Sequence, residues 1–340
     1  MGDTPVKVLH VGPKNYPPNH GGVEKVVFDL VTGMKDIESH VFTQWDSSGH
    51  NSNVHQLRSG LRASLNQVVT YCRANGVAVV HLPTENFIPL ALLLRVRRIK
   101  CVVTIHGCGW RLKRWALYYR IPIFLLDCLA CLLSPCVVFV GQTDRVCFQR
   151  LFPFRRLHFI PNGVVVSDDI AVPGIRKGMV YLGRLSPEKN IAALIEAAES
   201  AGVSVDLYGP LDRHDSQFRR RILERLESCE HVRWRGSVPF DRVCETISLY
   251  RCFVNVSHSE GLPVSVLEAA GEGLYLVLSD IPQHRTLDFP ECTYVDPDNI
   301  CFGALAADTL DGALNREHVR REFSAEKMVR AYREIYEGVT

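Results

Sequence analysis

Apolar residues along this chain gather in short runs separated by polar segments that contain glycine and proline. Runs of four to seven mostly apolar residues predict buried strands, and apolar positions that repeat every three or four residues predict helices. In the first half, strands are predicted over 6–12, 40–45, 77–82, 101–105, 137–140 and 157–160. Helices are predicted over 23–34, 61–73, 90–95 and 115–133. Strands that alternate with helices indicate a parallel sheet covered on both faces.

A polar segment at 165–177, interrupted by proline and glycine, predicts a linker between domains. Beyond it the alternation begins again, with strands predicted over 179–185, 204–210, 232–239, 252–256 and 274–280. Helices are predicted over 191–200, over 213–228 and directly after Pro263, which should lie in the first turn of its helix. A chain of 340 residues exceeds what one hydrophobic core usually serves, so two domains are expected.

The last helix is predicted over 323–338 and is amphipathic. Its inward face should carry Met328, Tyr332, Ile335 and Tyr336.

Composition is that of an ordinary globular enzyme, with 22% charged residues and a net charge of +2. That charge gives no field strong enough to suggest nucleic acid as a partner. The twelve cysteines lie singly in apolar segments, and the one C-x-x-C, Cys128 to Cys131, lacks a second pair. We therefore expect reduced core cysteines in a cytoplasmic protein, and the start of the chain has no features of a signal peptide.

The stretch from Ser257 to Gly271 carries the strongest candidate chemistry. It follows the predicted strand 252–256 and reads as a tight glycine loop leading into a helix, an arrangement whose free backbone amides favour an anion. Glu260 and Glu268 lie in the loop and about two turns into the helix, so both can border one site. Backbone amides can bind phosphates, and carboxylates can accept hydrogen bonds from hydroxyls. A sugar nucleotide carries both kinds of group, which suggests it as the ligand. Two carboxylates at this spacing alone would more often be solvated surface groups.

The pattern from Glu260 to Glu268 resembles the E-G-x-P-x-x-x-x-E signature of retaining glycosyltransferases of the GT-B type, the family-4 group. The segment Gly183-Arg184-Leu185-Ser186-Pro187-Glu188-Lys189-Asn190 is similar to the G-R-x-x-x-x-K-N motif of that family. Further segments with a family likeness are Gly21-Gly22-Val23-Glu24, Thr104-Ile105-His106-Gly107, Pro161-Asn162-Gly163-Val164 and Gly209-Pro210. The family often has Asp where this chain has Gly107.

The resemblance implies an α/β fold of two Rossmann-like domains that face each other across a cleft, with the last helix crossing back to the first domain. The acceptor-side domain would be 1–168, completed by 323–340, and the donor-binding domain would be 169–322.

The resemblance also implies roles for single residues. Arg184 and Lys189 would neutralise the donor diphosphate, His106 and Glu260 would hold the transferred sugar, and Glu268 would hold the ribose. Gly21 and Gly22 would lie over the diphosphate, and the backbone at Gly236 and Val238 would read the base. The remaining donor-binding residues would be Asn162, Gly209, Gly261, Leu262, Pro263 and Val264.

The implied activity is transfer of a sugar, with retained configuration, from a nucleotide-diphosphate sugar to a glycan or lipid-linked acceptor. UDP-sugars are favoured over GDP-sugars, and the setting would be bacterial surface-polysaccharide or glycoconjugate synthesis. No cofactor and no metal are expected, because no Asp-x-Asp pair follows any of the strands predicted above. A nucleotide-sugar epimerase of the same fold and a non-catalytic nucleotide-sugar-binding relative remain alternatives. A dehydrogenase is disfavoured, since the chain lacks a G-x-G-x-x-G.

The predicted helix 115–133 is the most apolar part of the chain, and its start is basic and aromatic. Arg120, Pro122 and Asp127 make it unsuitable as a membrane span. Arg111, Lys113 and Arg114, among aromatic residues from Trp110 to Tyr119, allow two interpretations. The helix either contacts the inner face of a membrane peripherally or is buried with a solvated basic end.

Overall fold

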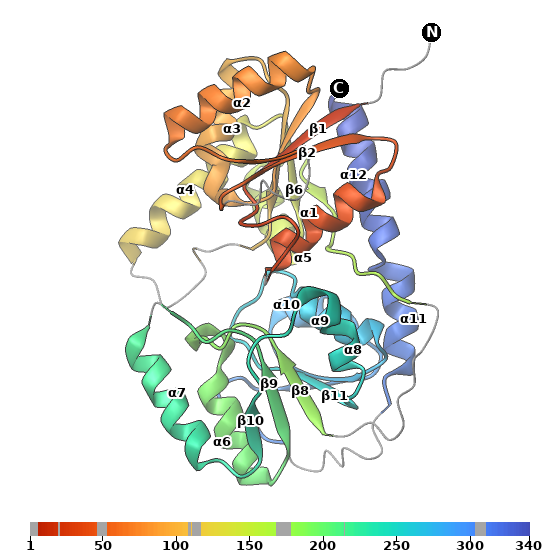
Figure 1. The fold of residues 1–340 in the computed structure, drawn as a ribbon. Coiled ribbons are helices and arrows are strands. Elements are labelled where there is room, and N and C mark those ends of the chain that lie inside the picture. Colours follow the sequence, from red (N-terminus) through yellow and green to blue (C-terminus); the bar gives the residue numbers. More distant parts are fainter. Residues whose placement is uncertain are drawn as a thin grey trace. The chain divides into compact units, whose positions relative to one another are not determined.

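The computed structural model describes residues 6–19, 21–45, 53–107, 110, 117–167, 178–213, 215–302 and 311–340. It divides into two compact units (Figure 1). Unit 1 is Met1–Gly163 with Ala325–Thr340, and unit 2 is Val164–Ser324. The sequence-based boundaries were 168 and 323, so the structure moves both by a few residues. The reason lies in Val164, which forms a parallel bridge with Ser324 and donates its amide to the Phe323 carbonyl at 2.9 Å.

Unit 1 contains a parallel sheet in the order β3-β2-β1-β4-β5-β6-β7, seven strands among the described residues. The strands are β1 (Lys7–Val11), β2 (Glu38–Thr43), β3 (Val54–Gln56), β4 (Val79–Leu82), β5 (Cys101–Ile105), β6 (Cys136–Phe139) and β7 (His158–Phe159). Its helices are α1 (Gly22–Gly33), α2 (Leu61–Asn75), α3 (Ile88–Val96), α4 (Leu117–Leu133) and α5 (Gln142–Leu151). Apolar side chains of α2, α3 and α4 pack on one face of the sheet.

The sequence pattern did not predict β3 or α5. Strand β3 has three residues, of which Val54 alone is buried, and α5 buries only Asp144 and Phe148. Neither segment shows the repeated apolar positions from which an element can be predicted.

Unit 2 contains a second parallel sheet, in the order β10-β9-β8-β11-β12-β13. Its strands are β8 (Met179–Leu182), β9 (Val205–Tyr208), β10 (Val232–Trp234), β11 (Cys252–Asn255), β12 (Tyr275–Ser279) and β13 (Cys292–Val295). Helices α6 (Ile191–Ala201) and α7 (Ser216–Ser228) pack against each other, and α9 (Val264–Gly271) packs against both α8 (Val243–Ile247) and α11 (Ala313–Glu322). Short α10 (Pro282–Arg285) follows β12. Strand β13 and helices α8, α10 and α11 were not predicted. Asp296 and Asp298 directly follow β13, so an Asp-x-Asp pair does stand at the end of this strand, contrary to the premise of the sequence-based expectation about metals.

Both units therefore confirm the predicted α/β class with parallel sheets. The strand order of unit 2 is that of the doubly wound dinucleotide-binding fold, in which the order reverses between β8 and β11.

The last helix, α12 (Ala325–Val339), belongs to unit 1 and packs against α1 (Figure 1). This confirms the prediction that it returns to the first domain. Of the residues predicted to face inward, Met328, Tyr332 and Tyr336 are buried and Ile335 is partly buried against the same core.

A buried polar cluster also fixes α12 to the sheet. Tyr336 Oη lies 2.9 Å from His81 Nδ1, and Tyr332 Oη lies 2.9 Å from Thr104 Oγ1. His81 Nε2 reaches the same Thr104 oxygen at 2.9 Å, and His10 Nδ1 lies 3.1 Å from His81 Nδ1. Burial lowers the pKa of His10 to about 3 and that of His81 well below its ordinary value. Both imidazoles are therefore neutral at physiological pH.

Of the eleven free cysteines among the described residues, five are buried and four are partly buried, and burial raises the pKa of Cys72 and of Cys101 to about 12. Cys244 and Cys301 depart from the prediction, because both are exposed. Each lies outside the apolar strands and long helices on which the prediction was based.

The histidine cluster predicts how stability depends on pH. In the unfolded chain the two imidazoles titrate near 6.5, so the unfolded state binds more protons as the pH falls below that value. The stabilising contribution is complete above this range and is lost toward the lower folded-state values, by up to about 1.4 kcal/mol per pH unit for each histidine. Urea unfolding between about pH 7.5 and pH 5 should show this slope, and His10→Asn should reduce it. An equal slope in the His10 variant would contradict the assignment.

Candidate active site

Ligands of doubly wound sheets bind outside the carboxyl ends of strands where the strand order reverses. In unit 2 that point lies between β8 and β11. The loops that leave these two strands carry the motifs from Gly183 to Asn190 and from Ser257 to Glu268. The fold therefore brings the two strongest sequence motifs to one edge of one sheet.

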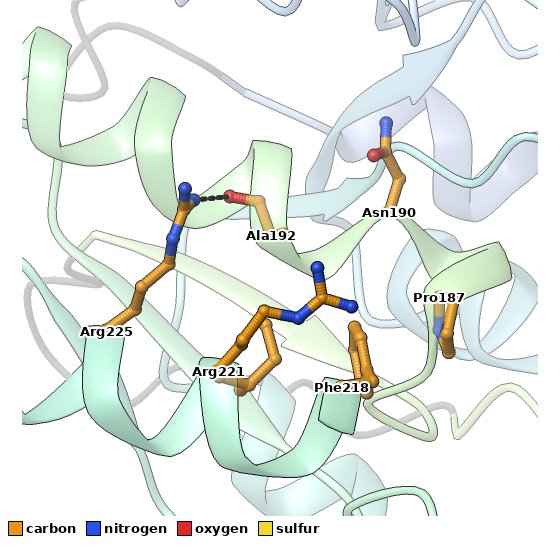
Figure 2. Close-up of a pocket in the computed structure, with 7 residues that line it drawn as sticks. Pro187, Asn190, Ala192, Phe218, Arg221 and Arg225 are labelled. Carbon is orange, nitrogen blue, oxygen red and sulfur yellow. Dashed lines mark hydrogen bonds between the residues drawn. The ribbon is translucent and has the colours of Figure 1, made fainter. Parts of the chain in front are cut away.

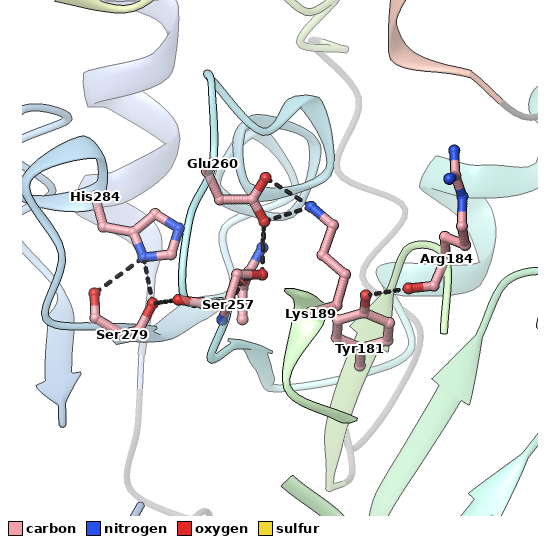
Figure 3. A network of polar contacts seen from close by, with 8 residues as sticks. Tyr181, Arg184, Lys189, Ser257, Glu260, Ser279 and His284 are labelled. Carbon is pink, nitrogen blue, oxygen red and sulfur yellow. Dashed lines mark hydrogen bonds and ion pairs between the residues drawn. The ribbon is translucent and has the colours of Figure 1, made fainter. Parts of the chain in front are cut away.

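An ion pair joins the two loops. Lys189 Nζ lies 2.6 Å from both carboxylate oxygens of Glu260 (Figure 3). The Glu260 side chain is 6% exposed and that of Lys189 is 23% exposed. Lys189 ends a short 3₁₀ turn, and Asn190 after it takes a left-handed conformation with φ +58° and donates to the Pro297 carbonyl at 2.7 Å. The family motifs imply that Lys189 binds the diphosphate and Glu260 the sugar, and in the structure the two side chains are in direct contact.

The Glu260 carboxylate also has polar neighbours from its own loop. Ser257 Oγ lies 2.7 Å from Glu260 Oε1, and Asn255 Nδ2 lies 3.2 Å from the same oxygen. The Asn255 amide oxygen in turn accepts from the Ser257 backbone amide at 3.1 Å. Oε1 is thus surrounded by donors, whereas Lys189 is the hydrogen-bond donor found at Oε2 among the described residues.

Glu260 is ionised despite its burial. Burial alone would raise its pKa, but the Lys189 charge and the hydrogen bonds from Lys189 and Ser257 outweigh burial and hold the pKa below its ordinary value. The contact with Lys189 is therefore a true ion pair at neutral pH.

Arg184, in the same motif as Lys189, has an exposed and positively charged side chain. Its guanidinium forms no hydrogen bond or ion pair with any residue that the structure describes, and in Figure 3 it extends away from Tyr181. The Arg184 carbonyl accepts a hydrogen bond of 2.9 Å from the buried Tyr181 hydroxyl, which fixes the backbone at this position. The backbone is held while the charged end stays available for an anion.

Two of the predicted glycines have conformations that favour glycine. A Cβ on Gly209 (φ +134°) would lie 2.0 Å from the Gly183 carbonyl oxygen, so the loops after β8 and β9 can approach this closely only because Gly209 lacks a side chain. Gly236 (φ +77°) accepts a hydrogen bond of 2.8 Å from the Gly209 amide, and the space where its Cβ would point is open. Val238 nearby is half-buried.

Helix α9 begins one residue later than the sequence suggested. Pro263 is the residue before the first helical position rather than part of the first turn, because its ψ of 111° is extended. Leu262 and Pro263 are buried, Gly261 and Val264 are half-buried, and Glu268 is buried in the second turn of α9.

The other predicted site residues belong to unit 1. His106 follows β5, and its Nε2 is buried without a hydrogen bond to any described residue. Burial lowers the pKa of His106 to about 4, so the ring is neutral. Gly21 and Gly22 begin α1, where a Cβ on Gly21 would lie 1.6 Å from the Glu24 carboxylate. Asn162 is buried after β7.

A hollow of about 220 Å³ lies between α6 and α7 (Figure 2). Phe218 and Ile222 form part of its lining, and Arg225 Nη1 donates to the Ala192 carbonyl at 3.2 Å beside it. Apart from Asn190 and Pro187, it contains no residue of the two motifs, and it is smaller than the ligand sites of about 300–1,000 Å³ that are usual in proteins. We do not assign the donor to this hollow.

Within the described part of the chain, no group of three or more His, Cys, Asp or Glu side chains is arranged to hold a metal ion. Among the helices that the structure describes, none is long and apolar enough to cross a membrane. The basic residues Arg111, Lys113 and Arg114, on which the membrane hypothesis partly rested, lie outside the described residues.

Two family models match the chain. The model described as "Glycosyltransferase Family 4" matches residues 20–168, and the one described as "Glycosyl transferases group 1" matches residues 176–301.

Relatives among characterised proteins include a GDP-mannose:cellobiosyl-diphosphopolyprenol alpha-mannosyltransferase of Xanthomonas campestris. It is 26% identical over 304 residues, which cover 82% of this chain and 79% of the relative. A UDP-Gal:alpha-D-GlcNAc-diphosphoundecaprenol alpha-1,3-galactosyltransferase of Escherichia coli is 26% identical over 228 residues, covering 57% and 55%.

Solved structures share the whole fold. Sucrose-phosphate synthase from Thermosynechococcus elongatus matches with a TM-score of 0.83 at 17% identity, covering 98% of this chain and 99% of that one. The Anabaena HepE protein in complex with UDP-glucose matches with a TM-score of 0.79 at 15% identity and the same coverage.

The buried ion pair predicts an asymmetric response to mutation. Lys189→Ala leaves an ionised carboxylate buried without its cation, so the Glu260 pKa should rise and the free energy of unfolding should fall by about 3 kcal/mol. Adding Glu260→Gln should recover most of that loss, because the charge that needed compensation is gone. Urea unfolding of the single and double variants measures both effects.

The exposed pair Arg225–Glu196, with atoms 3.3 Å apart, provides the control. Arg225→Ala should change stability little, since solvent screens exposed pairs. If Lys189→Ala behaved like this control, the buried pair would not stabilise unit 2.

Proposed function

This chain belongs to the family 4 glycosyltransferases (glycosyl transferases group 1), and we propose that it moves a hexose with retention from a nucleotide-diphosphate sugar to a glycan or lipid-linked acceptor. It is a hexosyltransferase with the GT-B fold, a fold that its solved structural neighbours share over nearly the whole chain.

The observation that carries the proposal is the arrangement of charges beside β8 and β11. Separation of a sugar from a diphosphate develops negative charge on the leaving group and positive charge on the sugar. Arg184 supplies an exposed cation, while Lys189 holds the buried, ionised Glu260. One loop therefore offers positive charge for a diphosphate and the other offers a carboxylate for the sugar.

The proposed roles follow from this geometry. Arg184 and Lys189 stabilise the departing diphosphate, with the amino end of α9 contributing its free amides. Glu260 Oε2 accepts a hydrogen bond from a hydroxyl of the transferred sugar. Among the described residues, this oxygen accepts a hydrogen bond from Lys189. His106 contributes a neutral ring whose Nε2 has no hydrogen-bond partner among the described residues, and Glu268 holds the ribose.

The proposal includes metal independence, because two side-chain cations can supply the positive charge that a metal would otherwise bring to the diphosphate.

The relatives differ in the nucleotide base of the donor for which they are named. The relative that spans 82% of the chain is named for GDP-mannose, and the shorter match from E. coli is named for UDP-galactose. The expectation from the family resemblance is a UDP-sugar, so UDP-sugars are tested first and GDP-mannose is tested beside them. Both relatives are named for acceptors on a polyprenyl diphosphate, which supports a lipid-linked acceptor in bacterial surface-glycan synthesis.

The test is release of free nucleotide diphosphate from UDP- and GDP-sugars in the presence of a polyprenyl-diphosphate sugar, with chelator added. One donor should be turned over and the product should keep its anomeric configuration. Arg184→Ala should lower kcat about 100- to 1,000-fold, the cost of losing one contact to developing charge in such a site. Arg221→Ala, an exposed arginine on α7, should retain wild-type turnover.

Three results would overturn the proposal. Donor conversion to another sugar without acceptor indicates an epimerase, and binding without turnover indicates a non-catalytic relative. Arg184→Ala activity within about threefold of wild type would remove the diphosphate role.

The outer face of α4 is consistent with an acceptor that is carried by a membrane lipid. Apolar side chains recur along that helix on its exposed side: Leu117, Tyr118, Ile121, Leu125, Leu129 and Leu132. Tyr118 is 67% exposed and Leu125 is 53% exposed. A helix with an apolar outer face and a basic start is typical of peripheral contact with an anionic membrane, here its inner face.

Co-sedimentation with liposomes tests this contact. Binding should rise with the fraction of anionic lipid, fall with salt, and be lost when Arg111, Lys113 and Arg114 become Glu, because each basic residue adds about 1 kcal/mol near such a surface. The same change at Arg219, Arg220 and Arg221 on α7 is the matched control and should preserve binding. Equal losses in both variants would indicate net charge rather than α4.

A further inference from the structure

His284 is a buried imidazole that the sequence motifs do not include. It lies on α10 directly after β12, and its side chain is fully enclosed. Its Nδ1 is 3.0 Å from the Ser279 carbonyl oxygen and 3.1 Å from Ser279 Oγ. A carbonyl oxygen only accepts, so Nδ1 carries the proton and the neutral ring has one fixed tautomer. Burial lowers the pKa of His284, which is consistent with a neutral ring.

The Ser279 hydroxyl connects His284 with the neighbouring strand β11. It donates to the Ser257 carbonyl at 2.6 Å, so its own oxygen remains free to accept from His284 Nδ1. This hydrogen bond fixes the backbone of Ser257 at the start of the loop that leaves β11. The interaction joins the carboxyl ends of β11 and β12, which are neighbours in the sheet.

Ser257 then contacts the ionised carboxylate. Its hydroxyl lies 2.7 Å from Glu260 Oε1 and 2.6 Å from Asn255 Oδ1, so its one proton is shared between these two acceptors. Lys189 holds Glu260 at 2.6 Å. A continuous series of hydrogen bonds therefore runs from His284 through Ser279, Ser257 and Glu260 to Lys189 (Figure 3).

We propose that His284 is a positioning residue, which fixes Glu260 against Lys189 through Ser279 and Ser257. The inference rests on the proposed transferase function in assigning Glu260 and Lys189 to the donor. His284 touches neither the carboxylate nor the ammonium by a hydrogen bond among the described residues. Its effect is on where the carboxylate stands.

The two nitrogens of His284 allow a sharp experiment. Nδ1 carries the proposed function, while Nε2 is buried and has no hydrogen-bond partner among the described residues. Asn places its amide nitrogen near the position of Nδ1, whereas Gln places its terminal group near that of Nε2. His284→Asn should therefore preserve the contact to Ser279, and His284→Gln and His284→Ala should lose it.

Kinetics with the donor that the wild-type enzyme turns over gives the first readout. His284→Ala and His284→Gln should lower kcat about 100-fold, the effect of a misplacement near 1 Å, with little change in the donor KM. His284→Asn should keep most of the wild-type kcat. Arg285→Ala is the matched control on the same helix, because Arg285 is exposed and pairs with Asp280 instead.

A crystal structure of each variant gives a readout that does not depend on activity. The Lys189 Nζ to Glu260 distance should exceed about 4 Å, the usual limit of an ion pair, in the Ala and Gln variants and stay near the wild-type value in the Asn variant. Rescue by Gln rather than Asn would assign the function to Nε2 and overturn the proposal. So would an unchanged pair in His284→Ala. A wild-type enzyme inactive on every donor contradicts the proposed transferase function, and the distances would then still decide the role of His284.

Discussion

The site in unit 2 depends on keeping one carboxylate charged inside the protein. Removing an ion from water costs several kcal/mol, and only close opposite charge and well-placed donors offset that cost. Glu260 has both, from Lys189 at 2.6 Å and from Ser257 and Asn255. Each of these partners stands at the carboxyl end of β8 or β11, or in the loop that follows it. The parallel pairing of these two strands is therefore a condition for the charge, and the charge is a condition for the proposed chemistry.

The loops at the carboxyl end of this sheet can lie close together because glycines allow their backbones to approach each other. Gly209 lies against Gly183 at a distance that excludes a Cβ, which brings the loop after β9 next to the loop that carries Arg184. The open space at Gly236 continues the same edge toward β10. Small residues at this edge thus serve a geometric purpose, since they leave room beside fixed backbone amides.

The sequence predicted most strands of both sheets, though not β3 or β13, and it predicted the motifs, because these features are local. Runs such as 101–105 are continuous and apolar, and Glu260 and Lys189 stand in recognisable motifs. The contact between these two residues could not be predicted from periodicity, since they are 71 positions apart and meet only through strand order. Strand β3 and helix α5 could not be predicted because each buries too few residues to give a periodic apolar pattern. His284 escaped because one histidine after a strand carries no signal until Ser279 and Ser257 are seen beside it.

The two units solve the burial of titratable groups in opposite ways. In unit 1, His10, His81 and His106 are kept neutral by burial, and tyrosine and threonine hydroxyls serve as partners for His81. In unit 2, Glu260 is kept charged by an adjacent cation. In the transfer reaction that we propose, the sugar becomes positive as it leaves the diphosphate, and an ionised carboxylate stabilises that developing charge. The protonation state that folding sets for Glu260 therefore suits the proposed reaction before any ligand binds.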